Sequence, residues 1–245
     1  MKAMVLAAGL GTRLRPLTND RPKALVEVAG RTLLELTLMR LRSFGIRDVI
    51  INVHHFAEVV VEYLREHDDF GMEIAISREN VLLDTGGGLK KAAWFFLEDH
   101  SEEPFILHNV DVLSTIDLAR MVEFHRTQQA LVTLAVQDRS TSRYLLFDSQ
   151  MQLCGRRAGP DGKPELVRAA SQFQALAFSG IHVISPHLLP MLSEDGAFSI
   201  ITSYLRLAGA GENICAFRAD EYAWRDMGKL ENIAKAAEDL KTYLQ

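Results

Sequence analysis

The chain has 245 residues, of which 48% are hydrophobic and 24% are charged, and its formal net charge is −5 at pH 7. A chain of this size and composition can bury a core large enough to fold without disulfides, which excludes intrinsic disorder as its default state. The acidic balance and the lack of a basic patch argue against a nucleic-acid-binding protein. Its two cysteines, Cys154 and Cys215, are isolated in the sequence, so neither a disulfide framework nor a zinc site is expected.

The first eight residues are mostly apolar, and a loop of glycine and arginine follows them at once. They are too few for a membrane span, and they lack the cleavage region of a secretory signal peptide. We therefore expect a buried first strand, no contact with a membrane and a cytoplasmic location.

Strand-like runs alternate with helical patterns along the chain. Apolar or β-branched runs predict strands at 3–8, 48–53, 73–77, 105–108, 131–136, 175–184 and 213–217. Apolar residues at helical spacing predict helices at 33–44, 57–65, 89–97, 116–127, 199–207 and 230–240, with a further short helix that begins at Pro186.

This order predicts an α/β fold, a doubly wound and mostly parallel mixed sheet of the Rossmann-like type with helices on both faces. The alternation of strands and helices stops at about 140–175, where glycines and prolines predict a small β-hairpin and loop insertion. We expect the whole of 1–245 to form a single domain. Because ligands bind beyond the carboxyl ends of the strands in such sheets, functional residues should directly follow the apolar runs.

The strongest local signal follows the first predicted strand, in the sequence Leu6-Ala7-Ala8-Gly9-Leu10-Gly11-Thr12-Arg13-Leu14. Glycines let backbone N–H groups approach phosphate oxygens, and a guanidinium can hold a phosphate with two N–H groups. The loop is not a dinucleotide fingerprint, because Leu14 stands where the third glycine would fall, and it lacks the ending of a Walker A loop. Taken alone, it is also compatible with a simple tight turn. Further along, Pro22 stiffens the chain before Lys23, which would aim a second positive charge.

Together with Pro16-Leu17-Thr18 and Pro22-Lys23, this loop resembles the signature of the sugar-1-phosphate nucleotidyltransferases. The resemblance implies that a nucleoside triphosphate is wrapped by the loop, through Leu6, Ala8, Gly9, Gly11, Thr12 and Arg13. It implies that Arg13 stabilises the departing pyrophosphate, and that Lys23 neutralises the α-phosphate or the sugar phosphate.

A second glycine-rich segment, Asp84-Thr85-Gly86-Gly87-Gly88, precedes the predicted helix at 89–97. Glycines at a helix entry would leave backbone donors free near its positive end, although they also suit an ordinary helix start. In the resembled family this segment lines the nucleoside pocket, which implies nucleotide-binding roles for Thr85, Gly86 and Gly87. The acidic residue followed by Thr-Gly-Gly-Gly is most similar to the branch that includes the N-acetylmuramate 1-phosphate uridylyltransferases, and related guanylyltransferases have similar runs.

Two aspartates are candidate metal ligands. Asp111 follows the apolar strand at 105–108, and Mg²⁺ commonly uses one or two carboxylates together with substrate phosphates. By resemblance, Asp226 in Trp224-Arg225-Asp226-Met227-Gly228 supplies the second carboxylate, and the two aspartates converge. Where the family usually has glycine and threonine, this chain has Val110 and Lys229.

The sugar 1-phosphate is expected to lie beside Phe178-Ser179-Gly180-Ile181, where the glycine of the family gives the sugar room. The resemblance implies sugar-phosphate contacts from Lys23, Asn109 and Gly180. In the insertion it points to Glu165, with Lys163 nearby. The histidines His54, His55 and His108 are interpreted as ordinary strand-end residues.

These features predict an Mg²⁺-dependent in-line displacement that joins a nucleoside triphosphate to a sugar 1-phosphate and releases pyrophosphate. UTP is favoured, with GTP next, and the expected acceptor is N-acetylmuramate 1-phosphate or a related hexose 1-phosphate. Guanylyl transfer to mannose or heptose 1-phosphate is one alternative, and uridylyl or thymidylyl transfer to glucose 1-phosphate is another. A non-catalytic regulator that binds nucleotide sugars is a third. The missing third glycine disfavours a nicotinamide-dependent dehydrogenase. We expect a monomer or homodimer, with no C-terminal β-helix domain of the kind that many relatives carry.

Overall fold

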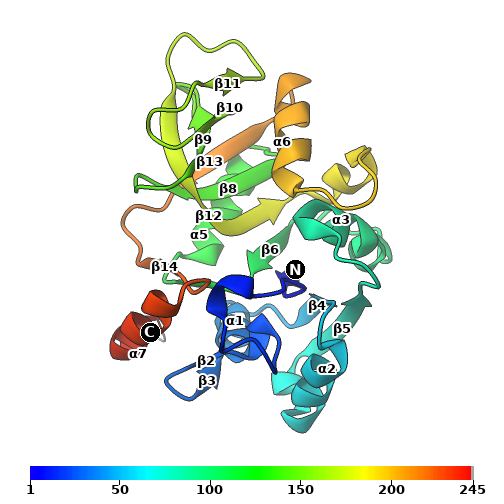
Figure 1. Cartoon of the computed structure of the whole chain (residues 1–245). Helices are drawn as coiled ribbons and strands as arrows, with labels where there is room; N and C mark the ends of the chain where they lie inside the picture. Colours follow the sequence, from blue (N-terminus) through cyan, green and yellow to red (C-terminus); the bar gives the residue numbers. More distant parts are fainter. Residues whose placement is uncertain (244–245) are drawn as a thin grey trace.

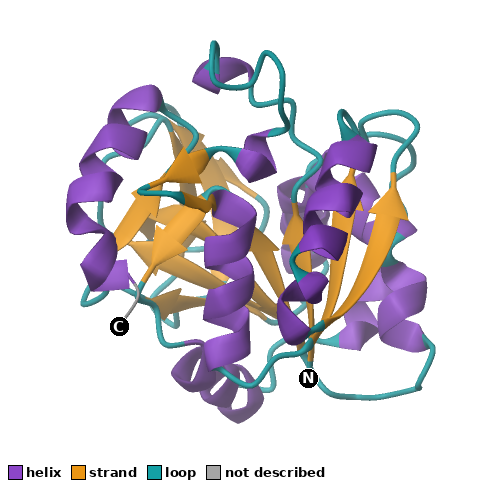
Figure 2. Ribbon diagram, turned by 90° about the horizontal axis from the view of Figure 1, so that it is seen from below, coloured by secondary structure: helices purple, strands orange, loops and turns teal. Residues whose placement is uncertain are grey.

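The computed structural model describes residues 1–243 as an α/β protein built on one large mixed sheet. Its strands lie in the order β11-β10-β9-β12-β6-β1-β4-β5, and β8 joins β12 to β13. Helices lie on both sides of this sheet (Figures 1 and 2). The predicted doubly wound architecture is therefore confirmed.

The strands of the large sheet are β1 (Lys2–Leu6), β4 (Asp48–Val53), β5 (Glu73–Arg78), β6 (Phe105–Asn109), β8 (Val132–Gln137), β9 (Arg143–Phe147), β10 (Leu153–Ala158), β11 (Glu165–Leu166), β12 (Gln174–Ile184) and β13 (Ile214–Arg218). Two small antiparallel pairs are β2 (Glu27–Val28) with β3 (Arg31–Thr32), and β7 (Val112–Ser114) with β14 (Trp224–Asp226). The α-helices are α1 (Leu33–Ser43), α2 (Ala57–Glu66), α3 (Asp84–Lys91), α4 (Ala93–Leu97), α5 (Leu118–Thr127), α6 (Ile200–Gly209) and α7 (Leu230–Tyr243). Four 3-10 turns are η1 (Thr12–Leu14), η2 (Lys23–Leu25), η3 (Asp68–Gly71) and η4 (Pro186–Met191).

The amino-terminal half of the sheet is parallel. Strand β1 pairs with β4 on one side and with β6 on the other, and β4 pairs with β5. Strands β1, β4 and β6 are buried on both faces and are almost continuously apolar, as parallel strands are in doubly wound folds. Their carboxyl ends open on one edge of the sheet, and the glycine loop and Asp111 follow two of them.

The other half of the sheet is antiparallel and is organised by the long strand β12. Its first part pairs with β9 and its second part with β6, while β8 pairs along the opposite side. Residues 140–175, predicted to hold a hairpin and loop, form β9, β10, β11 and the start of β12, so they extend the main sheet (Figure 1). The register shifts between Phe178 and His182, and Gly180 takes a positive φ of 76° inside this bulge.

Alternating residues of the central strands fill two apolar layers. Ala3 and Val5 of β1 belong to the layer beneath α1, α2 and α5, whereas Met4 and Leu6 belong to the layer beneath α3, α4 and α6. Predicted helix 89–97 differs most from the structure, because it begins at Asp84 and is divided at Ala92 into α3 and α4. No helix within residues 1–243 has the length and apolar character needed to cross a membrane.

Three buried histidines make stability depend on pH, and burial lowers the pKa of one of them, His108, to about 4. Burial lowers the pKa of His125 to about 4 and that of His182 to about 3, and their Nδ1 atoms lie 3.0 Å from Thr133 Oγ1 and 2.9 Å from Tyr204 Oη. In the unfolded chain all three titrate near 6.5. Below that pH the unfolded state therefore binds more protons, and the folded state loses stability.

We expect the free energy of unfolding to fall as the pH drops from 6.5 towards 4, by up to about 1.4 kcal/mol per pH unit for each histidine. Urea denaturation at pH 7.5, 6.5, 5.5 and 4.5 measures this dependence, and His182→Gln should make it less steep by removing the contribution of one histidine. A free energy of unfolding that stays constant across this range would contradict the assigned protonation.

Candidate active site

The glycine loop crosses the carboxyl end of β1 in a conformation that its sequence requires. Gly11 has a φ of 65° and precedes η1, and a Cβ atom at this position would lie 2.9 Å from the Thr18 side chain and 3.0 Å from that of Lys23. The Thr18 hydroxyl donates to the Gly11 carbonyl at 2.9 Å. Glycine therefore lets the loop fold tightly back onto the segment that carries Lys23.

The loop keeps an open side for a ligand. Leu6 and Ala8 are buried, and the Ala7 N–H donates to Asn52 Oδ1 at 2.7 Å, which fixes the base of the loop to β4. In contrast, Gly9 and Thr12 are exposed, and apart from its two chain neighbours no described residue has an atom within 4 Å of the position that a Cβ of Gly9 would take. The exposed backbone follows a segment that is fixed to β4, so a phosphate chain could approach it closely.

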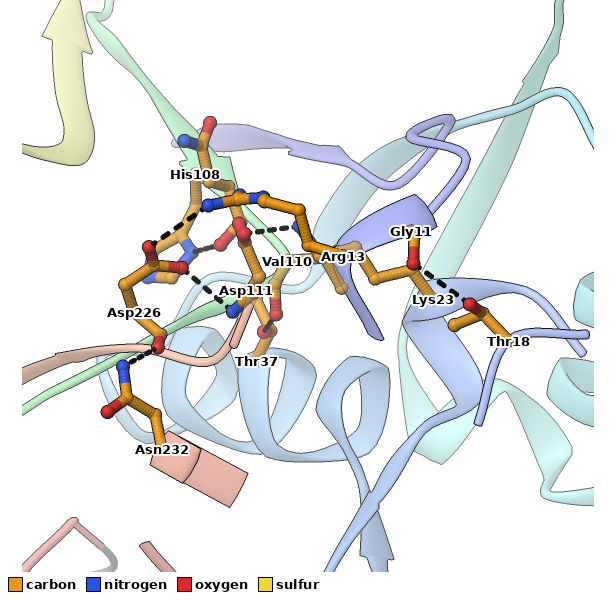
Figure 3. Close-up of polar contacts among 12 residues, drawn as sticks. Gly11, Arg13, Thr18, Lys23, Thr37, His108, Val110, Asp111, Asp226 and Asn232 are labelled. Atoms are coloured by element: carbon orange, nitrogen blue, oxygen red, sulfur yellow. Dashed lines mark hydrogen bonds and ion pairs between the residues drawn. The ribbon is translucent and has the colours of Figure 1, made fainter. Parts of the chain in front are cut away.

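The two predicted metal ligands converge, although they are far apart in the sequence. Asp111 lies in the turn between β6 and β7, and Asp226 ends β14, which pairs antiparallel with β7. The register places Asp226 opposite Val112, and the Met227 N–H donates to the Asp111 carbonyl at 2.7 Å. The short β7–β14 ribbon thus brings the two carboxylates to the same place (Figure 3).

Gly228 lies at the centre of this cluster. A Cβ atom on Gly228 would be 2.7 Å from Arg13 Nη2, 2.8 Å from Asp226 Oδ1 and 3.1 Å from Asp111 Oδ2. The Gly228 N–H also donates to Asp226 Oδ1 at 2.8 Å, and Asn232 Nδ2 donates to the Asp226 carbonyl at 2.6 Å. Three charged groups from distant segments therefore meet beside a residue that has no side chain.

Each carboxylate faces one of the two predicted cations. Lys23 Nζ donates to Asp111 Oδ2, and both of these side chains are largely buried. Arg13 Nη1 lies 3.8 Å from Asp226 Oδ2, and the Arg13 side chain is 60% exposed. The four groups form one alternating cluster (Figure 3), in which two carboxylates offer the oxygen ligands of a divalent cation and two cations can neutralise phosphate.

Val110 fits the core where the family usually has glycine. Its side chain is only 2% exposed and belongs to the apolar layer beneath α1. Its N–H donates to the Leu6 carbonyl at 3.2 Å, and its own carbonyl accepts from Thr37 Oγ1 at 3.4 Å. The branched side chain therefore holds the turn that presents Asp111.

The backbone N–H groups of the glycines at the start of α3 form hydrogen bonds within the protein. The N–H groups of Gly86 and Gly87 both donate to the Phe198 carbonyl, at 2.9 Å and 3.4 Å, and Thr85 Oγ1 accepts from the Ile200 N–H at 3.0 Å. A Cβ on Gly86 would lie 2.2 Å from the Phe198 ring. These backbone donors are therefore not free, because α3 packs closely on the segment before α6.

The predicted sugar-side residues divide into two groups. Gly180 touches Asn109, since a Cβ at Gly180 would lie 2.9 Å from Asn109 Nδ2 and 2.8 Å from the Val112 side chain. Glu165 instead lies in β11 at the edge of the sheet, where it is exposed and forms a 2.7 Å ion pair with Arg156. Two strands, β10 and β9, separate it from β12.

Sequence reasoning missed a buried polar bridge that supports the site. Asn52 Nδ2 donates to Glu79 Oε1 at 2.8 Å, and Glu79 Oε2 accepts from the Leu83 N–H at 2.9 Å. Asn52 thereby connects the glycine loop to the entry of α3. A single asparagine inside the apolar run of β4 was the signal that could have found it.

Comparison with known sequences identifies the family to which the chain belongs. The model of the nucleotidyl transferase family matches residues 2–242. An N-acetylmuramate α-1-phosphate uridylyltransferase from Caulobacter vibrioides is 36% identical, over 96% of this chain and 97% of that protein. A UTP–glucose-1-phosphate uridylyltransferase from Synechocystis and a mannose-1-phosphate guanyltransferase from Yarrowia lipolytica are each 28% identical over 96% and 94% of this chain. The chain spans 62% and 61% of the length of these two.

Solved structures share the fold. HddC from Yersinia pseudotuberculosis, crystallised with GMP-PN, has a TM-score of 0.76 at 22% identity over 98% of this chain and 99% of its own. A putative glucose-1-phosphate thymidylyltransferase from Bacillus anthracis has a TM-score of 0.78 at 17% identity, over 100% of this chain and 96% of its own. The chain belongs to the nucleotidyl transferase family of enzymes, and its curated relatives transfer uridylyl or guanylyl groups to sugar 1-phosphates.

Proposed function

We propose that this enzyme transfers a uridylyl group from UTP to N-acetylmuramate 1-phosphate, giving the UDP-sugar and pyrophosphate. This type of reaction is supported by four charged side chains that lie together beside Gly228. They are Arg13, Lys23, Asp111 and Asp226. The observation that favours this substrate pair is the 36% identity to the Caulobacter vibrioides enzyme over nearly the full length of both chains.

In this proposal the chain acts mainly by positioning and charge. A phosphate oxygen of the sugar 1-phosphate is already ionised at neutral pH, so it attacks the α-phosphorus of the nucleotide without a strong general base. Arg13 projects from η1 towards the departing pyrophosphate. Lys23, held within the fold by the turn at Pro22, neutralises the α-phosphate or the sugar phosphate.

The oxygen ligands of the site suit Mg²⁺, which we propose as its metal. Asp111 and Asp226 would hold it, since their carboxylate oxygens lie within 3.1 Å of one point beside Gly228. No group of three or more His, Cys, Asp or Glu residues suited to a metal occurs within the described part of the chain, which matches a cation that takes its remaining ligands from substrate phosphates and water. When bound, the metal supplies positive charge to the phosphates during displacement.

The nucleotide is proposed to lie over the glycine loop, with its phosphates on the backbone of Gly9 and Gly11. The base would lie against the entry of α3, where Thr85, Gly86 and Gly87 shape the wall through their packing. Asn109 and Gly180 would face the sugar phosphate. Guanylyl transfer to mannose or heptose 1-phosphate is the second candidate, supported by the Yarrowia lipolytica relative. A cytoplasmic enzyme that works as a monomer or homodimer remains our prediction.

Pyrophosphate release tests the proposal directly. The enzyme is assayed with Mg²⁺ and each of UTP, GTP, dTTP, CTP and ATP against N-acetylmuramate, N-acetylglucosamine, glucose, mannose and heptose 1-phosphates. We expect UTP with N-acetylmuramate 1-phosphate to exceed the other pairs by at least about tenfold in kcat/KM. A GTP pair that leads the grid would favour the second candidate, and a flat grid with retained nucleotide binding would favour the non-catalytic regulator.

A further inference from the structure

Arg139 lies beside the sugar-side residues, in the loop that follows β8. Strands β8 and β6 both run antiparallel to β12, so they are parallel to each other and their carboxyl ends lie at the same edge of the sheet. Arg139 Nη2 donates to the Phe178 carbonyl at 2.7 Å, in the bulge of β12 that contains Gly180. Its position is therefore the edge where ligands bind in this type of sheet.

The guanidinium of Arg139 is held in one orientation. It stacks on the indole of Trp224, with its central carbon 3.6 Å from the ring centroid. Trp224 Nε1 in turn donates to the Ser179 carbonyl at 2.7 Å. Trp224 is two residues before Asp226 in β14, so Arg139 bridges the bulge at Gly180 and the strand that carries the second carboxylate.

The positive charge of Arg139 has little compensation. The side chain is half-buried. Among residues 1–236, whose side chains the structure describes, its buried Nε has no hydrogen-bond partner and no carboxylate lies within 4.0 Å of it. Burial lowers the pKa of Arg139, and the more distant charge of Asp226 opposes that change. A partly desolvated guanidinium with donors to spare favours an anionic ligand, because its planar fork matches a carboxylate.

A second arginine, which lies in the insertion, also stacks on an aromatic ring. Arg157 of β10 lies opposite Tyr144 of β9 and stacks on its ring, 5.2 Å from the centroid. The Tyr144 hydroxyl accepts from the Thr141 N–H at 3.3 Å, in the loop that begins near Arg139. Arg157 thus adds a second positive charge beside Tyr144, the β9 residue that pairs with Ala177 of β12.

We propose that Arg139 binds a carboxylate carried on the sugar ring, and that it thereby selects an acidic sugar 1-phosphate over its neutral counterpart. N-acetylmuramate differs from N-acetylglucosamine by a lactyl ether that carries such a carboxylate, so the inference rests on the proposed function and gives it a specificity residue.

The test compares these two sugar 1-phosphates in the wild-type enzyme and in Arg139→Gln, with UTP and Mg²⁺. We expect the substitution to lower kcat/KM for N-acetylmuramate 1-phosphate by roughly 10–100-fold, mainly through KM, since a charge-assisted contact is lost. The value for N-acetylglucosamine 1-phosphate should change by less than about threefold. Arg139→Lys should recover part of the loss, and Arg65→Gln, an equal change on exposed α2, should leave both sugars unaffected.

An equal loss on both sugars would overturn the proposal, because Arg139 would then act only by supporting the bulge through Phe178. If the wild-type enzyme turns over neither sugar, the proposed function fails, and calorimetric binding of the two sugar 1-phosphates to wild-type and Arg139→Gln protein decides the role of Arg139 separately. In that measurement, selective loss of binding to the acidic sugar supports the role, and unchanged binding of both sugars contradicts it.

Discussion

Asp111→Asn should lower kcat by on the order of 10²–10³-fold, because in the proposed mechanism it removes one of the two carboxylates that would hold Mg²⁺ beside the reacting phosphates. The amide has the same shape, and the main-chain hydrogen bond from the Met227 N–H to the carbonyl of residue 111 does not depend on the side chain. The fold should therefore persist. Pyrophosphate release at saturating substrates measures the loss, and thermal unfolding checks that the variant is folded.

Nucleotide binding without a divalent cation gives a second readout for the same variant. In the wild-type structure Lys23 donates to the Asp111 carboxylate, so the lysine is not fully available to a phosphate. The neutral amide should release Lys23, and metal-free UTP should bind at least as tightly to Asp111→Asn as to the wild type. Asp48→Asn is the matched control, because Asp48 begins β4 at the opposite edge of the sheet. Wild-type turnover in Asp111→Asn would show that Asp111 has no role in the active site.

Local motifs made much of the site predictable. Arg13 and Lys23 belong to one short stretch whose glycines and prolines fix the turns, so their proximity follows from the chain itself. Asp111 was predictable because it follows a buried strand of a doubly wound sheet. The convergence of Asp226 with Asp111 rested on resemblance alone, because β7 and β14 are three residues each and show no recognisable alternation.

Tertiary packing determines features of the fold that the sequence pattern does not predict. Three successive glycines lower helix propensity, so the predicted helix at 89–97 began five residues after the start of α3. The contact between Gly86 and the ring of Phe198 compensates for that propensity, and no local pattern signals a partner so far along the chain. The bulge at Gly180 and its contacts with Arg139 and Trp224 depend in the same way on residues from three separate segments.

Gly228→Ala is the sharper test of whether these segments must meet as the structure shows. The backbone of Gly228 does not lie in the left-handed region, so alanine adds no conformational strain. Its methyl group would instead fall 2.7 Å from Arg13 Nη2, 2.8 Å from Asp226 Oδ1 and 3.1 Å from Asp111 Oδ2, and at least one of these groups must move.

A displacement of about 1 Å in a reacting arrangement can reduce a rate by about 10²-fold, and we expect kcat of Gly228→Ala to fall by that order while the free energy of unfolding changes little. Pyrophosphate release and urea denaturation measure the two quantities on the same protein. The loss should be close to that of Asp111→Asn, since both changes disturb the same point. Full activity in Gly228→Ala would mean that Arg13 and the two carboxylates separate when substrates bind, so that the cluster seen here would not be the reacting arrangement.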